Sequence, residues 1–257
     1  DTSATPNLSA EAQQAYSERL EAGGLTALAK EAGAVLLQGD TSRDRWVDAP
    51  DAPWPGVLPY DDLPSIERED YVLNANDSYW LANADETIDG DFSILQGQAG
   101  TERSVRTPEN FAVVSDTSPE GPSGEDGLFD LDELTTAALL DAAYTETQWR
   151  DGVVARCRAA TAPVAHPQIL KEDGSVYVAA GSVDVGGACD VLDAWDGHYN
   201  VDSEGAALWR EFTEAVDFDE LWGQAFDGAK PAATPAGLGA VPDGVEDPVL
   251  VGLALAV

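Results

Sequence analysis

The chain has 257 residues, enough for one large domain or two small ones, and 48 acidic against 13 basic residues give it a formal net charge of −35. A surface this acidic repels nucleic acid and anionic membranes, so we expect neither as a partner. With 44% hydrophobic residues and seven tryptophans, the chain can bury a sizeable core, and we expect a folded protein rather than a disordered acidic one.

The charge pattern also suggests an environment. Lysine occurs only at Lys30, Lys171 and Lys230. Dense counterions screen the self-repulsion of an acidic, lysine-poor surface, so high salt favours this composition. We expect a halophilic source.

No run of 18 apolar residues occurs, so no membrane-spanning segment is predicted. The first residues lack the basic and apolar regions of a signal peptide. Methionine is absent even at position 1, and we therefore expect the chain to be a processed or excised piece.

The first predicted element is a helix from Leu8 to Leu28, in which Ser9 serves as the N-cap and Gly23-Gly24 interrupts the helical pattern. A short apolar strand is predicted at 34–37. A proline-rich loop from Gly39 to Pro64 follows, and a second strand is predicted at 71–76.

Helices dominate the rest of the prediction. Asp130 and Glu133 form a capping-box pattern, and Asp247 precedes Pro248 as an N-cap before an apolar run. Helices are predicted at 109–114, 130–144, 146–158, 189–195, 204–216 and 248–257, and a strand at 176–179. The last helix stops while still apolar, so we expect the chain to continue beyond it.

The two cysteines, Cys157 and Cys189, lack the spacing of a metal site. We expect one disulfide between them, with two buried free thiols as the alternative.

Common catalytic motifs are absent: the sequence has no Gly-x-Ser-x-Gly, no P-loop, no His-Glu-x-x-His and no dinucleotide-binding glycine pattern. His166 and His198 are expected to be surface or turn residues. No carboxylate pair can be singled out among 48 acids, so a glycosidase has no anchor in this sequence.

The stretch Tyr71–Trp80 combines two asparagines with aromatic residues at the end of a predicted strand. Amides there could donate hydrogen bonds to a developing oxyanion. The alternative for Asn74 and Asn76 is turn chemistry or backbone bonding. Tyr79 and Trp80 are expected to be core or wall residues.

This stretch, Leu-Asn-Ala-Asn-Asp-Ser-Tyr-Trp at 73–80, resembles the oxyanion segment of the penicillin acylase family, in its acyl-homoserine-lactone and aculeacin acylase branch. Other segments resemble that family in the same order along the chain. They are Gly56-Val-Leu-Pro-Tyr60, Leu192-Asp-Ala-Trp-Asp-Gly197 with Asn200 and Asp202, Gly205–Phe212 and Thr234–Leu238.

The resemblance implies an α+β fold: part of the four-layer αββα sandwich of an N-terminal nucleophile hydrolase, with helical insertions. The family makes an autoprocessed precursor whose beta chain begins with a serine that is both nucleophile and, through its α-amine, base. This chain begins at Asp1 and has no such nucleophile. We therefore expect residues 1–257 to form a single partial domain from inside a beta chain, with an alpha chain and the rest of the beta chain as partners.

The resemblance implies a role for a few residues. Asn76 matches the asparagine that supports the oxyanion, with Asn74 and Ser78 as its neighbours. Arg106 matches the arginine that orients that asparagine, and Arg103 is the fallback. The alternative is that both arginines pair with nearby acids.

The expected function is hydrolysis of the amide of an acylated small molecule, such as an acyl-homoserine lactone, a penicillin-like compound or a lipopeptide, by a secreted or periplasmic enzyme. The chain alone should be inactive. No cofactor is expected. Calcium occurs in some relatives, but the acids from Asp85 to Asp91 are too generic to assign as ligands. The competing interpretation is a non-catalytic acidic binding module that uses the loop 46–54 and Asn74–Trp80.

Overall fold

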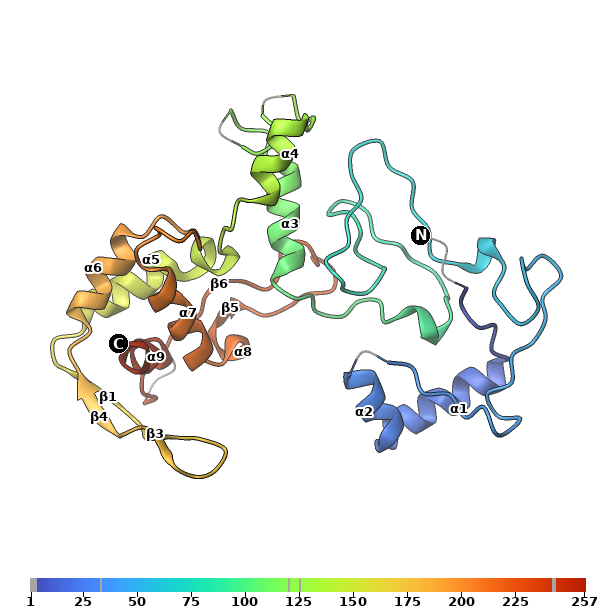
Figure 1. Cartoon of the computed structure of the whole chain (residues 1–257), viewed down its shortest axis with the longest axis horizontal. Helices are drawn as coiled ribbons and strands as arrows, with labels where there is room; N and C mark the ends of the chain where they lie inside the picture. Colours follow the sequence, from blue (N-terminus) through green and yellow to red (C-terminus); the bar gives the residue numbers. More distant parts are fainter. Residues whose placement is uncertain (1–3, 33, 120, 125, 242–243) are drawn as a thin grey trace. The chain divides into compact units, whose positions relative to one another are not determined.

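A computed structural model describes residues 4–32, 34–119, 121–124, 126–241 and 244–257 (Figure 1). The chain divides into two compact units, Asp1–Thr101 and Glu102–Val257, and each is described by itself. Helices and small antiparallel sheets occur together, in agreement with the predicted α+β class. Within the described ranges, each helix is too short or too polar to cross a membrane.

The first unit begins with two helices, α1 (Ala10–Glu21) and α2 (Leu25–Glu31). The side chain of Ser9 accepts a hydrogen bond from the backbone N–H of Ala12, so the predicted N-cap is confirmed. Gly23 and Gly24 both have positive φ angles, 78° and 75°, and they separate the helices where the sequence predicted an interruption. Beyond these helices, regular structure in the described part of this unit consists of two 3₁₀ turns, η1 (Tyr60–Asp62) and η2 (Ile94–Gln96).

Both strands predicted in this unit are wrong. Residues 34–37 form no strand, and Val35 and Leu36 are exposed rather than packed in a core. Residues 71–76 also form no strand. Side chains replace the missing strand partner at Tyr71, because Asp70 accepts from its N–H at 2.7 Å and Asn83 donates to its carbonyl oxygen at 3.0 Å.

The core of the first unit is small and is built largely from irregular backbone. Leu8 and Tyr16 contribute from the N-terminal segment and α1, and Val57, Trp80 and Leu81 from the loops. Isolated antiparallel bridges join Pro6 to Val57 and Leu8 to Trp46. The Gly56–Tyr60 motif therefore lies where the N-terminal segment crosses the long loop.

The second unit is mainly helical, with three two-stranded antiparallel sheets among its described residues. Its helices are α3 (Arg106–Ser115), α4 (Leu131–Ala138), α5 (Tyr144–Ala159), α6 (Gly186–Ala194), α7 (Ala206–Ala215), α8 (Phe218–Leu221) and α9 (Pro248–Ala256). The sheets pair β1 (Val164–His166) with β4 (Gly181–Val183), β2 (Ile169–Leu170) with β3 (Val176–Val178), and β5 (Trp222–Gln224) with β6 (Ala236–Leu238).

Most helix predictions in this unit are confirmed, and one is too long. The capping box of Asp130 and Glu133 opens α4, and Asp247 caps α9 as predicted. However, α4 ends at Ala138 rather than continuing to Tyr144. Asp141 takes a positive φ of 46°, which a continuing right-handed helix cannot contain.

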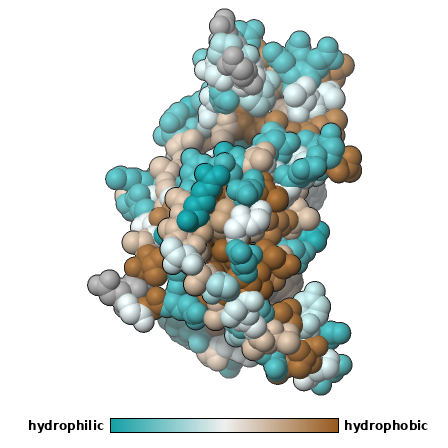
Figure 2. Space-filling view, turned by 90° about the vertical axis from the view of Figure 1, so that its left-hand side faces the viewer, coloured by the Kyte–Doolittle hydropathy of each residue, from teal (hydrophilic) through white to brown (hydrophobic). Residues whose placement is uncertain are grey.

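Aromatic rings form the centre of the second unit. Trp149, Trp209 and Phe212 are almost completely buried, and Val249 and Leu253 of α9 join them. A side chain at Gly252 would meet Val216 at 2.4 Å, so this glycine lets α9 lie close to the end of α7. Other surfaces are mixed, and Figure 2 shows one face on which hydrophobic side chains lie between hydrophilic ones.

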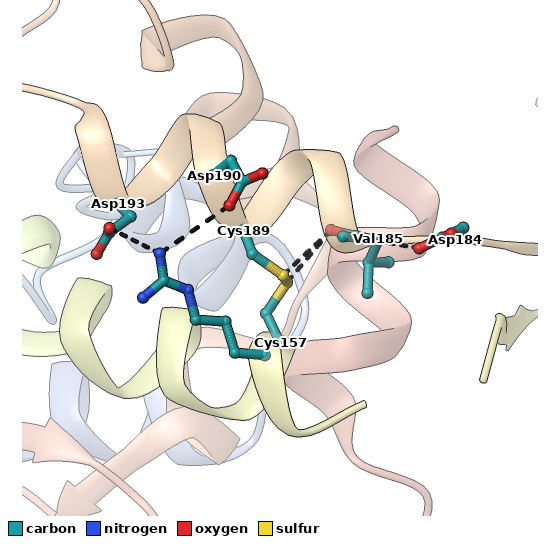
Figure 3. Close-up of a disulfide and its surroundings, with 8 residues drawn as sticks. Cys157, Asp184, Val185, Cys189, Asp190 and Asp193 are labelled. Atoms are coloured by element: carbon teal, nitrogen blue, oxygen red, sulfur yellow. Dashed lines mark hydrogen bonds and ion pairs between the residues drawn. A yellow bond between two sulfur atoms is a disulfide. The ribbon is translucent and has the colours of Figure 1, made fainter. Parts of the chain in front are cut away.

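The predicted disulfide joins Cys157 of α5 to Cys189 of α6 (Figure 3). Both cysteines are buried, and the carbonyl oxygen of Val185 lies 3.4 and 3.2 Å from their sulfurs. Arg158 forms ion pairs with Asp193 at 2.7 Å and with Asp190 at 4.0 Å. The covalent link therefore ties together the two helices that flank the β-hairpins, and the alternative of free thiols is wrong.

The Leu192–Gly197 motif has a packing role. Trp195 is buried and its Nε1 donates to the carbonyl oxygen of His198 at 2.9 Å. A side chain at Gly205 would lie 2.7 Å from Cβ of Trp195, and the φ of Gly205 is +110°. These residues connect the end of α6 to the start of α7.

Candidate active site

The two asparagines of the Tyr71–Trp80 stretch form one compact turn. Asn74 Oδ1 accepts a hydrogen bond from the backbone N–H of Asn76 at 2.7 Å, and Asn74 Nδ2 donates to the carbonyl oxygen of Asp77 at 3.3 Å. Asn76 has a φ of +63°, in the left-handed region that few residues other than glycine adopt. Both asparagines are exposed. The Asn74 side chain therefore bonds to the backbone of the turn, which is the alternative that the sequence analysis left open for it.

Buried side chains lie within this turn and just after it. Ala75 is 6% exposed and Trp80 only 3%. Tyr79 packs edge-on against Phe92, with ring centroids 5.4 Å apart. Ser78 points inward: its Oγ is buried without a hydrogen bond among the described residues, and a side chain at Gly97 would meet it at 2.6 Å. The Ser78 hydroxyl therefore lies in the interior, whereas Asn76 is exposed.

Asn83, which the sequence analysis did not single out, supports the backbone on both sides of the turn. Asn83 is completely buried; its Nδ2 donates to the Tyr71 carbonyl oxygen, and its Oδ1 accepts from the N–H of Asp85 at 2.9 Å. The Tyr71 hydroxyl accepts from the N–H of Ala84 at 3.2 Å. These bonds connect the chain entering the turn to the chain leaving it. A lone asparagine among acids carries no pattern that could have revealed this role.

An ion-pair group lies next to Asn83. Arg68 binds Asp70 through two hydrogen bonds, of 2.9 and 2.6 Å, and Glu86 through one of 2.6 Å. The Arg68 guanidinium holds the pKa of Asp70 well below its usual range, and the N–H of Tyr71 adds to the effect. Asp70 therefore stays ionised and keeps the backbone of Tyr71 in place.

The two candidate arginines lie in the second unit and differ in exposure. Arg103 is buried, 8% exposed, and its guanidinium carbon is 5.7 Å from the centroid of the Phe226 ring. Arg106 is exposed and begins α3. Because Asn76 belongs to the other unit, the structure describes the asparagine and the arginines separately, and their predicted roles stay predictions.

Arg106 lines a pocket of about 230 Å³ in the second unit. Glu109, one turn further along α3, also lines it, together with Tyr144, Tyr199 and Phe218. Burial raises the pKa of Glu109, and nearby Glu146 raises it further while His198 opposes the change. Burial also raises the pKa of Tyr144. The pocket therefore combines a cation, an acid that resists ionisation and aromatic walls.

The ring of each histidine lies near a backbone carbonyl oxygen. His198 Nδ1 lies 2.8 Å from the carbonyl oxygen of Leu140, and Ala142 forms a backbone bridge with His198. His166 lies in β1, where its Nδ1 is 3.3 Å from the carbonyl oxygen of Pro167. Across the described ranges, no group of three or more histidine, cysteine or acidic side chains is arranged to hold a metal ion, and the acids from Asp85 to Asp91 receive no assignment as calcium ligands.

The chain is similar in sequence to known acylases. The penicillin amidase family model matches residues 3–243. Aculeacin-A acylase of Actinoplanes utahensis is 32% identical over 209 residues, which are 79% of this chain and 24% of that protein. The acyl-homoserine lactone acylases PvdQ of Pseudomonas putida and Pseudomonas fluorescens are each 29% identical over 206 residues, which are 79% of this chain and 23% of those proteins.

The matched part is a minority of each relative. The chain spans about a quarter of the length of the curated relatives it matches. The residues matched by the family model, 3–243, contain the asparagine turn, both arginines and the disulfide.

Proposed function

The chain belongs to the penicillin amidase family, and from this we propose that it is an internal part of an autoprocessed acylase that hydrolyses the amide of an acylated small molecule. The names of its relatives support this substrate class, since they are acylases of aculeacin A and of acyl-homoserine lactones. Acyl-homoserine lactones, penicillin-like compounds and lipopeptides are the candidate substrates. The complete protein would have the four-layer αββα sandwich and export to the periplasm or cell exterior.

The observation that carries the proposal is the conformation of Asn76. An exposed amide on a left-handed residue that follows the buried Ala75 is a preorganised hydrogen-bond donor. Such a donor stabilises charge that develops in a transition state because it needs no reorganisation when the charge appears.

In the proposed reaction, a serine at the start of the complete beta chain attacks the substrate carbonyl carbon through its Oγ, and its own α-amine accepts the proton. Negative charge develops on the carbonyl oxygen, and Asn76 Nδ2 donates a hydrogen bond to it. Collapse of this intermediate breaks the C–N bond, and the leaving amine takes the proton. Water then hydrolyses the acyl ester and releases the carboxylic acid.

Arg106 is the proposed positioning residue for this asparagine, with Arg103 as the alternative. A guanidinium presents several N–H donors in a rigid plane, which suits it to fix the direction of a neighbouring amide. Its positive charge would also lower the pKa of the serine α-amine and keep that amine a free base near neutral pH.

Replacement of Asn76 by alanine in the complete, processed enzyme tests the proposal. We expect kcat to fall about a hundredfold or more while autoprocessing and thermal stability are kept. Asn110→Ala, an exposed asparagine of α3, is the matched control and should keep full turnover. Near-wild-type turnover in Asn76→Ala would refute the assigned role.

The two arginines can be separated in the same assay. Arg106→Lys keeps the charge but loses the planar set of donors, so we expect a lower kcat. A loss confined to Arg103→Lys would transfer the role to Arg103.

One observation favours the competing function, a binding module without catalysis. Trp46 and Trp54 of the long loop are 51% and 58% exposed, as expected of side chains that contact a ligand. The coding sequence upstream discriminates between the two, because an autoprocessed acylase requires a Gly-Ser or Gly-Cys processing site there. The lack of such a site would remove the enzyme hypothesis.

Further surfaces of the second unit fit a chain that packs against more protein. Leu131 and Leu134 of α4 are 77% and 55% exposed, and Leu128 and Leu139 at its two ends are 69% and 68% exposed. We assign this face to the remainder of the beta chain or to the alpha chain.

A further inference from the structure

The side chain of Asn74 brackets Asn76 on both sides. Its Oδ1 accepts from the N–H of Asn76 itself, and its Nδ2 donates to the carbonyl oxygen of Asp77, the next residue. The first bond, at 2.7 Å, is short for an amide donor and a neutral acceptor. A single side chain thus binds the peptide group that precedes Asn76 and the one that follows Asp77.

The backbone of Asn76 needs this support. A left-handed φ costs a residue with a Cβ about 1 kcal/mol or more, although asparagine tolerates the region better than most. Ala75, which precedes Asn76 inside the turn, and Trp80, which follows the turn, are both buried. The two hydrogen bonds of the Asn74 side chain favour this conformation of Asn76 from inside the turn.

The direction of the Asn76 amide follows from its backbone. If φ of Asn76 returned to a negative value, the Cα–Cβ bond would point elsewhere and the amide would leave its present position. Displacement of a catalytic group by about 1 Å can cost about a hundredfold in rate. A residue that holds φ of Asn76 near +63° therefore controls the rate without touching the substrate.

We propose that Asn74 is a positioning residue, whose side chain keeps Asn76 in the left-handed conformation that aims its amide at the oxyanion. The proposal rests on the proposed function and adds to it. It assigns no contact between Asn74 and the substrate. Asn74 and Asn76 then act as one unit.

Kinetics of the complete, processed enzyme test this role. For Asn74→Ala we expect kcat to fall about ten- to hundredfold with KM changed less than about twofold, because binding is kept and only the donor is misdirected. Asn74→Ser supplies a shorter, neutral acceptor that forms the same kind of turn more weakly, and it should recover part of kcat. A wild-type kcat in Asn74→Ala would overturn the proposal.

A double-mutant cycle distinguishes positioning from an independent effect. If Asn74 acts through Asn76, then Asn74→Ala should change kcat by less than about twofold once Asn76 is alanine. Full additivity of the two losses would show that Asn74 does not act through Asn76 and would overturn the inference.

The same cycle distinguishes failure of the proposed function of Asn76 from failure of the positioning role of Asn74. Wild-type turnover in Asn76→Ala alone would defeat the proposed function at this site. A large loss in Asn76→Ala with none in Asn74→Ala would defeat only the positioning role. Should Asn74→Ala fail to fold, Asn74→Ser in both backgrounds completes the cycle.

Discussion

Asn83 Nδ2 donates a hydrogen bond to the carbonyl oxygen of Tyr71, 3.0 Å away, from a side chain that is completely buried. The same side chain accepts from the N–H of Asp85. Asn83 therefore satisfies backbone groups on two segments that no β-sheet connects, and it defines where the asparagine turn begins.

Replacing Asn83 by alanine should lower the free energy of unfolding of the first unit by about 2 to 3 kcal/mol. The change leaves the Tyr71 carbonyl oxygen and the Asp85 N–H without their partner and opens a small cavity. Urea unfolding measures the effect, with Gln98→Ala, an exposed amide of the same unit, as the control. Equal stability of the two variants would contradict the assigned role.

Asp70 should make the first unit sensitive to acid. Its pKa in the folded state lies below its value in the unfolded chain, so its contribution to stability is present above the unfolded pKa of about 3.9 and is lost as pH falls through the folded pKa. Asp70→Asn, which mimics the protonated form, should be less stable than the wild type at pH 7. The difference should shrink only below about pH 4.

Unfolding of both proteins at several pH values checks this expectation, and the comparison removes the shared effect of the other carboxylates. A difference that persists unchanged into strong acid would show that the Arg68–Asp70 pair is not its cause.

Glu109 should act in the opposite direction. Burial raises its folded pKa above the ordinary 4.5, so the folded state binds this proton more tightly and stability falls as pH rises between the two values. Glu109→Gln should therefore be more stable than the wild type at neutral pH and equal to it below pH 4.5. Thermal unfolding across this range tests the sign, with the exposed Glu220→Gln as control.

The disulfide should contribute substantially to the second unit. Cys157 and Cys189 are 32 residues apart in sequence, and for a loop of that length the chain-entropy model assigns about 3 to 4 kcal/mol. Cys157→Ser combined with Cys189→Ser should lose this amount, as measured by denaturant unfolding. Addition of reductant should destabilise the wild type and leave the double variant unchanged, which separates the bond from the effect of the serines.

Salt should stabilise the chain if the acidic composition is an adaptation to a halophilic environment. A net charge of −35 repels itself, and raising salt from about 0.1 M to about 2 M shortens the screening length from about 10 Å to a few ångströms. We expect the melting temperature to rise over this range. A constant or falling melting temperature would remove the halophilic hypothesis.

Local signals explain which elements the sequence could predict. The caps at Ser9, Asp130 and Asp247 involve residues within three positions of one another, and each is confirmed. The sequence did not predict the end of α4, because the residue with the positive φ after it is Asp141 and not a glycine. Strands of two or three residues are too short for alternation to show, so only the β3 segment was predicted.

The candidate site divides in the same way. The disulfide was predictable because only two cysteines exist. Asn76 was singled out because its motif is continuous in sequence, and its role stays a prediction. The predicted strand at 71–76 is wrong. An apolar run followed by amides resembles a strand end when the hydrogen-bond partners of its backbone are unknown. Those partners, Asp70 and Asn83, are side chains, and their role depends on contacts across the loop.

The aromatic cluster of the second unit has a practical consequence for spectroscopy. Trp149 and Trp222 lie 4.6 Å apart and Trp195 and Trp209 5.4 Å apart, between ring centroids, whereas the first unit buries Trp80 and exposes Trp46 and Trp54. Rings held in a fixed asymmetric environment produce near-ultraviolet circular dichroism, which disappears when tertiary packing is lost. That signal should therefore report mainly on the second unit, so that its melting can be followed optically without any attached dye.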